Sequence, residues 1–474
     1  MEARTRRHDV DMTSGSIVRH LLYFALPLLL GNIFQQLYNM VDTWVVGNYV
    51  SNEAFSAVGS VGPITNMLIG FFGGLSSGAG AVISQYYGAK QYDKVRDTVH
   101  TALIMTAVLG VVFTVLGIAI APLMLGLMKT PKNVIGESQA YLTIYFAGIM
   151  GLMIYNVGAG ILRAVGDSRR PFYFLVVSAV INTVLDLVFV LCFDLGVRGV
   201  AYATIIAQGV SALLVLLTLL TSNTCVRVQL RALRCDFSLL GKIIKIGIPA
   251  ALQMAVTGFS NVFVQSYINA FGANGMSGWT AYAKIDQLIL LPMQSVSLAS
   301  TTFVAQNLGS RQDARARAGV RRALMISWGT TAVLMIPVMI FAPYLVAFFN
   351  DTPAVIAYGT LLLRWISPFY LLCCVNQILA GALRGAGNTR APMVIMLSSF
   401  VLFRQVYLYF MTDHIIPYLQ SVMDLTQNMR LILTAMSYPA GWLLATVLTS
   451  LYYHNVKLTK STVIEENTPK NAQA

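Results

Sequence analysis

Charged residues are scarce in this sequence. They make up 11% of its 474 residues, whereas 56% are hydrophobic and the mean hydropathy is +0.67. A soluble globular chain is normally about a quarter charged, and few water-soluble folds could bury this much apolar surface. The scarcity therefore excludes most soluble classes and indicates a chain whose main solvent is lipid.

Motifs for catalysis and nucleotide binding are also absent. The five histidines are scattered, and the five cysteines show neither metal-ligand spacing nor a disulfide framework. Gly241-Lys242 lacks the upstream glycines and the following Ser or Thr of a phosphate loop. We therefore expect that the chain is not an enzyme, that it has no cofactor and that it does not drive transport with ATP by itself.

Long apolar runs recur along the whole chain, each of the roughly 20 residues that cross a bilayer core. They are continuous rather than alternating, which favours helices over a closed barrel. Residues 1–16 are polar and the first run is too long for a signal peptide, so we expect an uncleaved anchor. The predicted fold is an all-α membrane protein with twelve transmembrane helices near residues 17–46, 53–82, 97–128, 137–161, 170–193, 197–222, 238–271, 278–306, 320–349, 354–382, 391–412 and 430–454.

The basic residues fall mainly on one side of these spans. That side includes Arg4, Arg6, Arg7, Lys90, Lys94, Arg169, Arg170, Arg231, Arg234, Arg315, Arg317, Arg321 and Arg322. The other side holds Lys129, Lys132, Arg198 and Arg430. Cytoplasmic loops are enriched in Lys and Arg, so both termini are predicted to lie in the cytoplasm. The same bias explains the net charge of +13 without a nucleic-acid partner.

The two halves of the chain repeat one another. The segment AGILRAVGDSRRP at 159–171 matches AGALRGAGNTRAP at 380–392, an offset of 221 residues, and 84–96 matches 305–317 with the same offset. Six spans separate the copies, so both halves have the same orientation, related by a pseudo-two-fold axis along the membrane normal. Transporters built this way bind substrate between the halves. The predicted units are a tail (1–16), a six-helix lobe (17–222), a linker (223–237), a second six-helix lobe (238–455) and a second tail (456–474).

Acidic residues are rarer still within the spans, where only Asp42, Asp186 and Asp286 occur away from the predicted ends. A charge at the bilayer centre costs about 2.5–3.5 kcal/mol on insertion scales, so each acid is a candidate functional residue. The alternative is that these acids hold helices together by pairing with arginine or backbone groups.

Polar side chains of the first half recur at helical spacing around these acids. Gln35, Tyr38 and Asn39 share a face with Asp42, and Asn182 lies four residues before Asp186. Thr204 and Gln208 are also four apart. Three helices are therefore predicted to converge on one polar pocket, with Pro27 bending the first. Two carboxylates there cannot both stay ionised cheaply, so H⁺ or Na⁺ is expected to neutralise them, the Na⁺ at Asp42, Asn182 and Asp186.

The second half carries a polar stripe without an acid on its first span. Asp286 lies on the next span, and we expect it to meet Lys284 or Arg404 through a bend or a neighbouring helix. We expect a substrate cavity lined by Gln35, Tyr38, Asn39, Tyr155, Asn156, Gln208, Gln253, Thr257, Asn261, Asp286 and Met293.

The chain resembles the multidrug and toxic compound extrusion (MATE) family of bacterial exporters. The resemblance covers about residues 15–455 and includes ALPLLLGNIFQQLYNMVDTWVVG at 25–47 and the paired motifs LRAVGDSRRP and LRGAGNTRAP. It implies a V-shaped two-lobed fold in the bacterial inner membrane that exports amphipathic, often cationic compounds in exchange for H⁺ or Na⁺. It also implies a cation site in the first lobe, at positions matching Asp42, Asn182, Asp186 and Thr204.

This sequence lacks the carboxylates that another subgroup of the family has on spans 7 and 10, which favours the first-lobe site. The expected partners are a small-molecule substrate and the lipid bilayer, with the monomer as the functional unit. Two alternatives remain: a flippase for lipid-linked saccharides, which would need a cationic cavity, and a non-transporting scaffold or receptor. For the flippase, Lys284 and Arg404 are the candidate cations.

Overall fold

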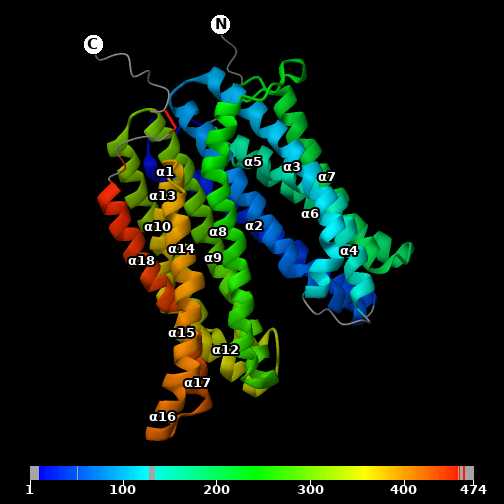
Figure 1. Ribbon diagram of the computed structural model, residues 1–474, viewed down its shortest axis with the longest axis vertical. Helices are drawn as coiled ribbons and strands as arrows, with labels where there is room; N and C mark the ends of the chain where they lie inside the picture. Colours follow the sequence, from blue (N-terminus) through cyan, green and yellow to red (C-terminus); the bar gives the residue numbers. More distant parts are fainter. Residues whose placement is uncertain (1–9, 51, 128–133, 457, 459–462, 465–474) are drawn as a thin grey trace.

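The computed structural model describes residues 10–50, 52–127, 134–456, 458 and 463–464. Two groups of helices meet at the end of the molecule where both termini lie, here called the terminal end, and separate toward the opposite, far end (Figure 1). In this part of the chain, eleven helices are long and apolar enough to cross a membrane, and one bent pair supplies a twelfth span. The predicted all-helical, two-lobed fold is confirmed.

The six spans of the first half follow one another without interruption by other elements. They are α1 (Ile17–Tyr49), α2 (Asn52–Gly88), α3 (Tyr92–Leu127), α4 (Ile135–Ala147) with α5 (Ile149–Ala164), α6 (Arg169–Leu187) with the π-turn η1 (Val188–Cys192), and α7 (Gly196–Thr221). The fourth span bends by 48° between α4 and α5, at Gly148.

The second half repeats this order with more breaks. It consists of α8 (Phe237–Asn269), α9 (Gly272–Gly309), α10 (Asp313–Ile340), α11 (Ala342–Ala347), α12 (Pro353–Ile366), η3 (Ser367–Phe369), α13 (Tyr370–Gly385), α14 (Arg390–Leu397), η4 (Ser398–Phe403), α15 (Arg404–Phe410), η5 (Met411–Ile415), α16 (Ile416–Val422), α17 (Gln427–Ala435) and α18 (Ser437–Val456). The last two spans are therefore composite helices.

Each half begins with a side-chain cap. Ser16 accepts from the backbone of Arg19 at the start of α1, and Asp236 accepts from Ser238 and Leu239 at the start of α8. Such caps satisfy amide groups that the first helical turn leaves unbonded. They fix where the two pseudo-equivalent helices begin.

Helices α1 and α8 each pass from one lobe to the other. The first part of α1 packs with α9 and α10 around Phe303, and its later part packs with α2, α4 and α5. In the same way, α8 starts among α2, α3 and α5 and ends in the core of the second half. We call α2–α7 with the later part of α1 the first lobe, and α9–α18 with the later part of α8 the second lobe.

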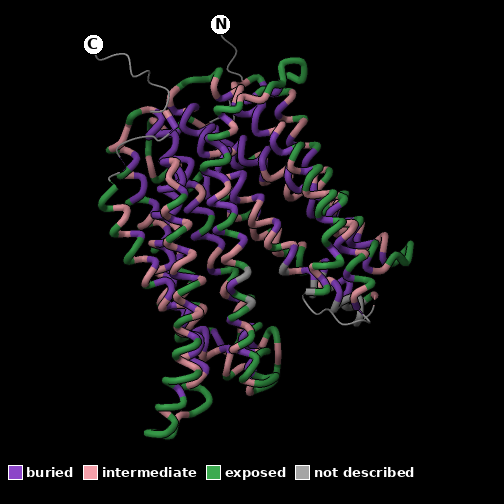
Figure 2. Tube along the Cα trace, in the orientation of Figure 1, coloured by how far each residue is buried: buried purple, intermediate pink, exposed green. Residues whose placement is uncertain are grey.

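The lobes touch most closely where α2 and α8 cross. Gly74 lies against Ala251 and Gly78 against Gly247, so closely that a β-carbon at either α2 position would overlap backbone of α8. Small residues permit such close helix contact. Buried residues concentrate at this junction, whereas exposed residues dominate the far end (Figure 2).

Hydrogen bonds join the lobes at the terminal end in a pseudo-symmetric pair. Gln85 of α2 donates to the Gly385 carbonyl at 2.7 Å, and Gln306 of α9 donates to the Ala164 carbonyl at 2.9 Å. The N-terminal segment adds to them, because Met12 donates to Gln306 at 3.0 Å. The terminal end is thus closed.

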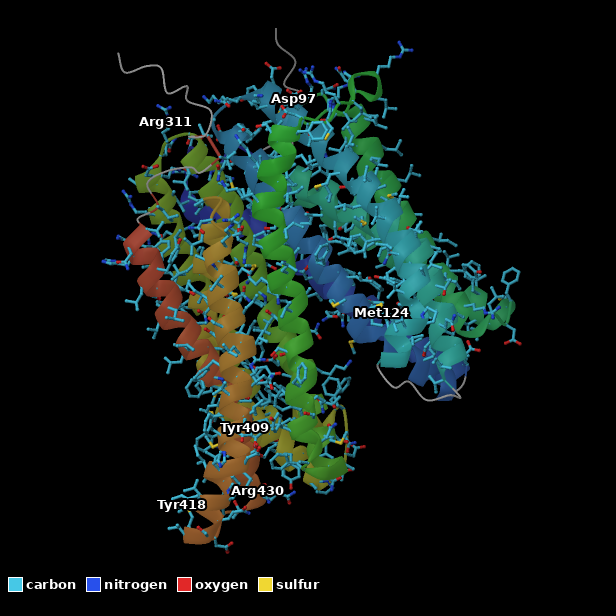
Figure 3. The ribbon with its side chains drawn as sticks, viewed as in Figure 1. Asp97, Met124, Arg311, Tyr409, Tyr418 and Arg430 are labelled. Atoms are coloured by element: carbon cyan, nitrogen blue, oxygen red, sulfur yellow. The ribbon has the colours of Figure 1, made fainter. Side chains whose placement is uncertain are left out.

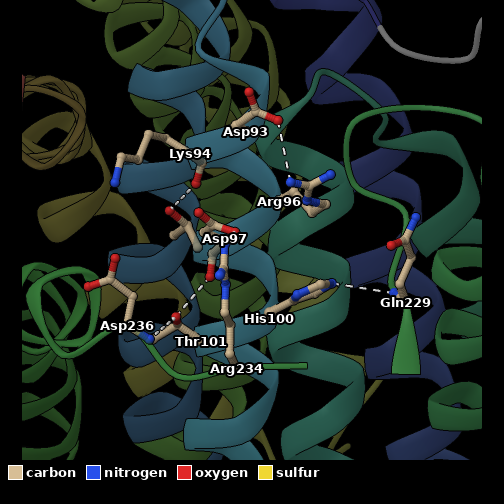
Figure 4. Close-up of polar contacts among 10 residues, drawn as sticks. Asp93, Lys94, Arg96, Asp97, His100, Thr101, Gln229, Arg234 and Asp236 are labelled. Carbon is tan, nitrogen blue, oxygen red and sulfur yellow. Dashed lines mark hydrogen bonds and ion pairs between the residues drawn. The ribbon is translucent and has the colours of Figure 1, made fainter. Parts of the chain in front are cut away.

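The segment between the halves is fixed against α3. Arg234 lies 3.6 Å from Asp97, Asp236 donates its backbone amide to Thr101, and Gln229 donates its amide to His100 (Figure 4). The short 3₁₀ turn η2 (Leu230–Ala232) lies within this segment.

Several predictions fall on residues outside the described ranges. These are the positions of Arg4, Arg6, Arg7, Lys129 and Lys132, and most of both tails. The limits of the lobes and linker remain predictions.

Candidate functional site

Two carboxyl groups lie side by side in the first lobe. Asp42 comes from α1 and Asp186 from the end of α6, and their side chains are close enough to interact directly. They are 8% and 0% exposed. Because α1 and α6 pack along each other, the polar faces predicted for both helices meet here.

These carboxyl groups lack the usual compensation for burial. Within the described residues, one oxygen of Asp42, both oxygens of Asp186 and both amide atoms of Asn182 have no hydrogen-bond partner. Buried polar atoms are nearly always hydrogen-bonded, so a cluster of five unpartnered atoms is unusual. Its oxygens suit a proton or a hard cation.

Tyrosines from α4 complete the surroundings. Tyr141 lies near both carboxyl groups and Thr204, and Tyr145 lies near Gln208. Tyr38 of α1 also lies near Asp42. Tyr141 and Tyr145 are not among the predicted site residues, although their four-residue spacing places both hydroxyl groups on one face of a helix that crosses the membrane.

A pocket of about 140 Å³ follows α1 away from the carboxyl groups toward Pro27. The predicted residues Gln35, Tyr38, Tyr155, Asn156 and Gln208 all line it. Tyr155 donates to the Pro171 carbonyl at 3.1 Å, and Asn156 donates to the Leu152 carbonyl at 2.9 Å. The predicted residue Asn39 lies on α1 and is exposed.

A larger cavity of about 490 Å³ lies between the halves. Gln253 and Thr257 line it as predicted. Arg163 and Arg384 line it too, and the sequence analysis did not select them. They lie in the two repeated motifs, so the repeat itself was the signal that could have identified them.

Two charged groups within the spans of the second lobe contact polar or aromatic side chains of the same lobe. Asp286 accepts from Tyr370 at 2.5 Å and from Tyr282 at 3.3 Å. Arg404 donates to Asn261 at 2.8 Å and lies 4.1 Å from the centre of the Tyr438 ring.

Two interpretations therefore need correction. Asp286 forms an ion pair with neither Lys284 nor Arg404 among the described residues, because two phenol groups occupy its carboxylate and Asn261 occupies the guanidinium. Met293, predicted to line the cavity, is fully buried in the core of the second lobe.

Comparison with known proteins identifies the family. A MatE family model matches the chain twice, at residues 27–188 and 249–410. The chain belongs to the MATE family. A probable multidrug resistance protein of Bacillus subtilis, YpnP, is 30% identical over 83% of this chain and 88% of its own length. A second from the same organism, YoeA, is 32% identical over 80% of this chain and 84% of its own length.

Solved MATE structures share the fold. One, described as an outward-facing conformation of a multidrug resistance MATE family transporter of the MOP superfamily, superposes with a TM-score of 0.87. It is 22% identical, and the alignment covers 95% of this chain and 98% of that one. The family match and the relatives of 30% identity or more make this chain a MATE-family membrane transporter and not an enzyme, which removes the scaffold or receptor alternative.

Proposed function

We propose that this MATE transporter is a secondary antiporter that exports small amphipathic organic compounds in exchange for H⁺ or Na⁺. The observation that carries the proposal is the buried Asp42–Asp186 pair with its unpartnered oxygens. Two negative charges in a low-dielectric site repel each other, and entry of one cation relieves the repulsion. Cation binding therefore changes the local charge by one unit beside α1, which can bias a two-state element.

The coupling site consists of Asp42, Asn182, Asp186 and Thr204. For Na⁺, the carboxylates and the Asn182 and Thr204 oxygens supply hard oxygen ligands. For H⁺, one of the two neighbouring carboxyl groups takes up the proton, which removes one of the two negative charges. The described residues contain no group of three or more His, Cys, Asp or Glu side chains arranged for a metal ion. A site with two carboxylates suits a cation that must leave again in each cycle.

The membrane orientation follows from the basic residues. Arg311 lies at the terminal end, and Arg430 lies at the far end (Figure 3). We place the terminal end in the cytoplasm and the protein, as a monomer, in the bacterial plasma membrane. The conformation closed at the terminal end is then the outward-open state of an alternating-access cycle.

The driving force is adequate for efflux. A membrane potential of about 100 mV supplies about 2.3 kcal/mol for each charge moved. At about 1.4 kcal/mol for each tenfold ratio, this supports a gradient of about fifty-fold.

The test is transport in proteoliposomes on which pH and Na⁺ gradients are imposed separately. We expect Asp42→Asn and Asp186→Asn to abolish gradient-driven transport, because each removes one of the two negative charges whose repulsion drives cation binding. Asp286→Asn is the matched control, since this carboxylate also lies within a span but accepts hydrogen bonds from tyrosines. Gradient-driven transport that persists in both first-lobe variants rejects the coupling role.

A flippase for lipid-linked saccharides remains the second candidate. It would need cationic side chains in the central cavity, and Arg163 and Arg384 provide them. The cations predicted from the sequence for this role were Lys284 and Arg404. The same two arginines weigh against the cationic substrate that the family resemblance implies.

A further inference from the structure

The central cavity between the halves has an unusual chemical lining for an exporter of cations. Its described lining contains two guanidinium groups, eight hydroxyl side chains and four carboxamides, but no carboxylate. Leu28, Met254, Met396 and Phe400 supply apolar surface beside them. A ligand that matches this lining carries a negative group and an apolar body.

The two guanidinium groups are held in the same way in each half. Arg163 donates to the Ser76 hydroxyl at 3.5 Å, and that hydroxyl donates to the Asn156 carbonyl at 2.6 Å. Arg384 donates to the Ser297 hydroxyl at 3.4 Å, and Ser297 donates to the Gln377 carbonyl at 2.6 Å. Each serine hydroxyl donates one hydrogen bond to a backbone carbonyl and accepts one from the arginine.

These positions are related by the 221-residue repeat. Arg163 and Arg384 occupy equivalent places on α5 and α13, so the pseudo-two-fold axis brings both to one cavity. Helix α5 belongs to the first lobe and α13 to the second, so each lobe contributes one arginine to the cavity. A group bound between them would contact both halves of the transporter.

Neither arginine is neutralised within the described part of the chain. No ion pair involves either one there, and each donates a single hydrogen bond, to serine, out of five available N–H groups. Arg384 is only 7% exposed. Holding two unpaired cations within the membrane-spanning part of a protein costs free energy, and an anion bound between them offsets that cost.

We propose that the central cavity binds an organic anion, an amphipathic molecule whose carboxylate, sulfonate or phosphate group is held by Arg163 and Arg384. This proposal rests on the proposed export function and names its substrate class. Arginine forms bidentate bonds with planar carboxylates and with phosphates, which gives the pair selectivity over neutral and cationic compounds. Methionines and Phe400 accommodate varied apolar bodies.

The experiment measures binding by purified protein in detergent, without any gradient. The anionic probe is carboxyfluorescein and the cationic probe is ethidium, followed by fluorescence polarisation. We expect Arg163→Gln and Arg384→Gln each to weaken carboxyfluorescein binding at least tenfold, with partial recovery in Arg163→Lys and Arg384→Lys. Ethidium binding should not weaken in any of them. Arg231→Gln, in the exposed linker, is the matched control and should bind both probes as the wild type does.

Two results overturn the proposal: carboxyfluorescein binding that is unchanged in both glutamine variants, or a wild-type protein that binds ethidium but not carboxyfluorescein. A glutamine variant that does not fold, as judged by size-exclusion chromatography, is replaced by the corresponding lysine variant. Lysine keeps the positive charge, so complete loss of anion binding in a folded lysine variant contradicts a charge-based site.

Two further arms separate the possible sources of the anion and the two proposals. Displacement of carboxyfluorescein by a polyprenyl pyrophosphate at much lower concentration than by inorganic pyrophosphate identifies a lipid-linked ligand, and equal displacement identifies a soluble one. The coupling proposal is tested on the aspartate variants in proteoliposomes and this one on the arginine variants in detergent, so the two experiments share no variant. The result for the coupling site therefore does not decide the result for the anion site, and the failure of one proposal can be distinguished from the failure of the other.

Discussion

At the scale of single residues, the three intramembrane acids handle burial in two different ways. Asp286 accepts hydrogen bonds from two phenol groups on α9 and α13. Asp42 and Asp186 instead face each other with unpartnered oxygens. A satisfied carboxylate stabilises a fold, whereas an unsatisfied pair retains the capacity to bind a cation. This difference supports the proposal that the first-lobe pair couples transport to a cation, and it predicts that Asp286 stabilises the fold.

Replacing Tyr370 with phenylalanine tests the stabilising role of Asp286. The change removes the closer of its two donors and leaves a half-buried carboxylate oxygen poorly satisfied, which we expect to destabilise the protein by about 1–3 kcal/mol. The measurement is the thermal unfolding midpoint in detergent, which should fall, while gradient-driven transport keeps its ion dependence. Tyr418→Phe is the control, because Tyr418 is exposed at the far end (Figure 3). An unchanged midpoint for Tyr370→Phe would assign another role to Asp286.

The sequence identified the acids but not their full surroundings. Helical spacing placed Asn182 beside Asp186 and put Tyr38 on the face of Asp42, because such spacing survives any tertiary arrangement. Arg163 and Arg384 were missed because a basic residue at the end of an apolar run reads as a loop residue facing water. Whether such a residue faces water or a cavity depends on how the two lobes pack, and a local sequence pattern carries no information about that packing.

At the scale of elements, α1 connects the two lobes across a proline. Pro27 lies inside a helix that continues from Ile17 to Tyr49. The residues before it pack on the second lobe, and those after it lead to Asp42 in the first. Proline removes one backbone hydrogen bond and clashes with the preceding turn, so the helix bends most easily there. Pro249 occupies the equivalent place in α8.

Replacing Pro27 with alanine tests this hinge. Alanine restores the backbone donor and stiffens α1, so the first lobe can no longer move freely relative to the start of the helix. We expect the initial rate of transport to fall severalfold while the dissociation constant of the substrate changes little. Pro122→Ala in α3 is the matched control, since Pro122 also lies inside a helix but is exposed. Equal rates in wild type and Pro27→Ala would exclude the hinge.

Element boundaries were predicted less well than element number. The fourth span was expected as one helix over 137–161, yet it divides into α4 and α5 at Gly148, a residue with poor helix propensity. The eleventh, expected to end near 412, continues through π-turns to Val422. Hydropathy detects the apolar part of a helix and cannot show how far it extends beyond the membrane.

At the scale of the whole molecule, the repeat predicted two similarly oriented lobes but not how they interlock. The passage of α1 and α8 between lobes, and the hydrogen bonds from Gln85 and Gln306, depend on contacts between residues hundreds of positions apart. Each such bond contributes about 1 kcal/mol net, so the closed terminal end is favoured by a small margin that substrate and cation can reverse. Close packing of α2 on α8 provides the rest of the closure.

The glycine contact between α2 and α8 yields the sharpest test of the cycle. A β-carbon at Gly78 would overlap the backbone of Gly247, so Gly78→Leu should prevent the terminal end from closing and hold the lobes apart there. Spin labels at the exposed, pseudo-equivalent positions Asp93 and Ala314, in a background without the five native cysteines, report this separation. We expect a longer distance than in the wild type and loss of transport.

Gly241→Leu provides the matched control for the same experiment. Gly241 lies near the start of α8, and a β-carbon there meets no atom within 4 Å. The same leucine side chain is therefore added at the same end of the molecule without separating the helices, and we expect the wild-type distance distribution and transport. If Gly78→Leu also keeps the wild-type distances, the contact of α2 with α8 does not control closure, and the hydrogen bonds from Gln85 and Gln306 must hold the terminal end on their own.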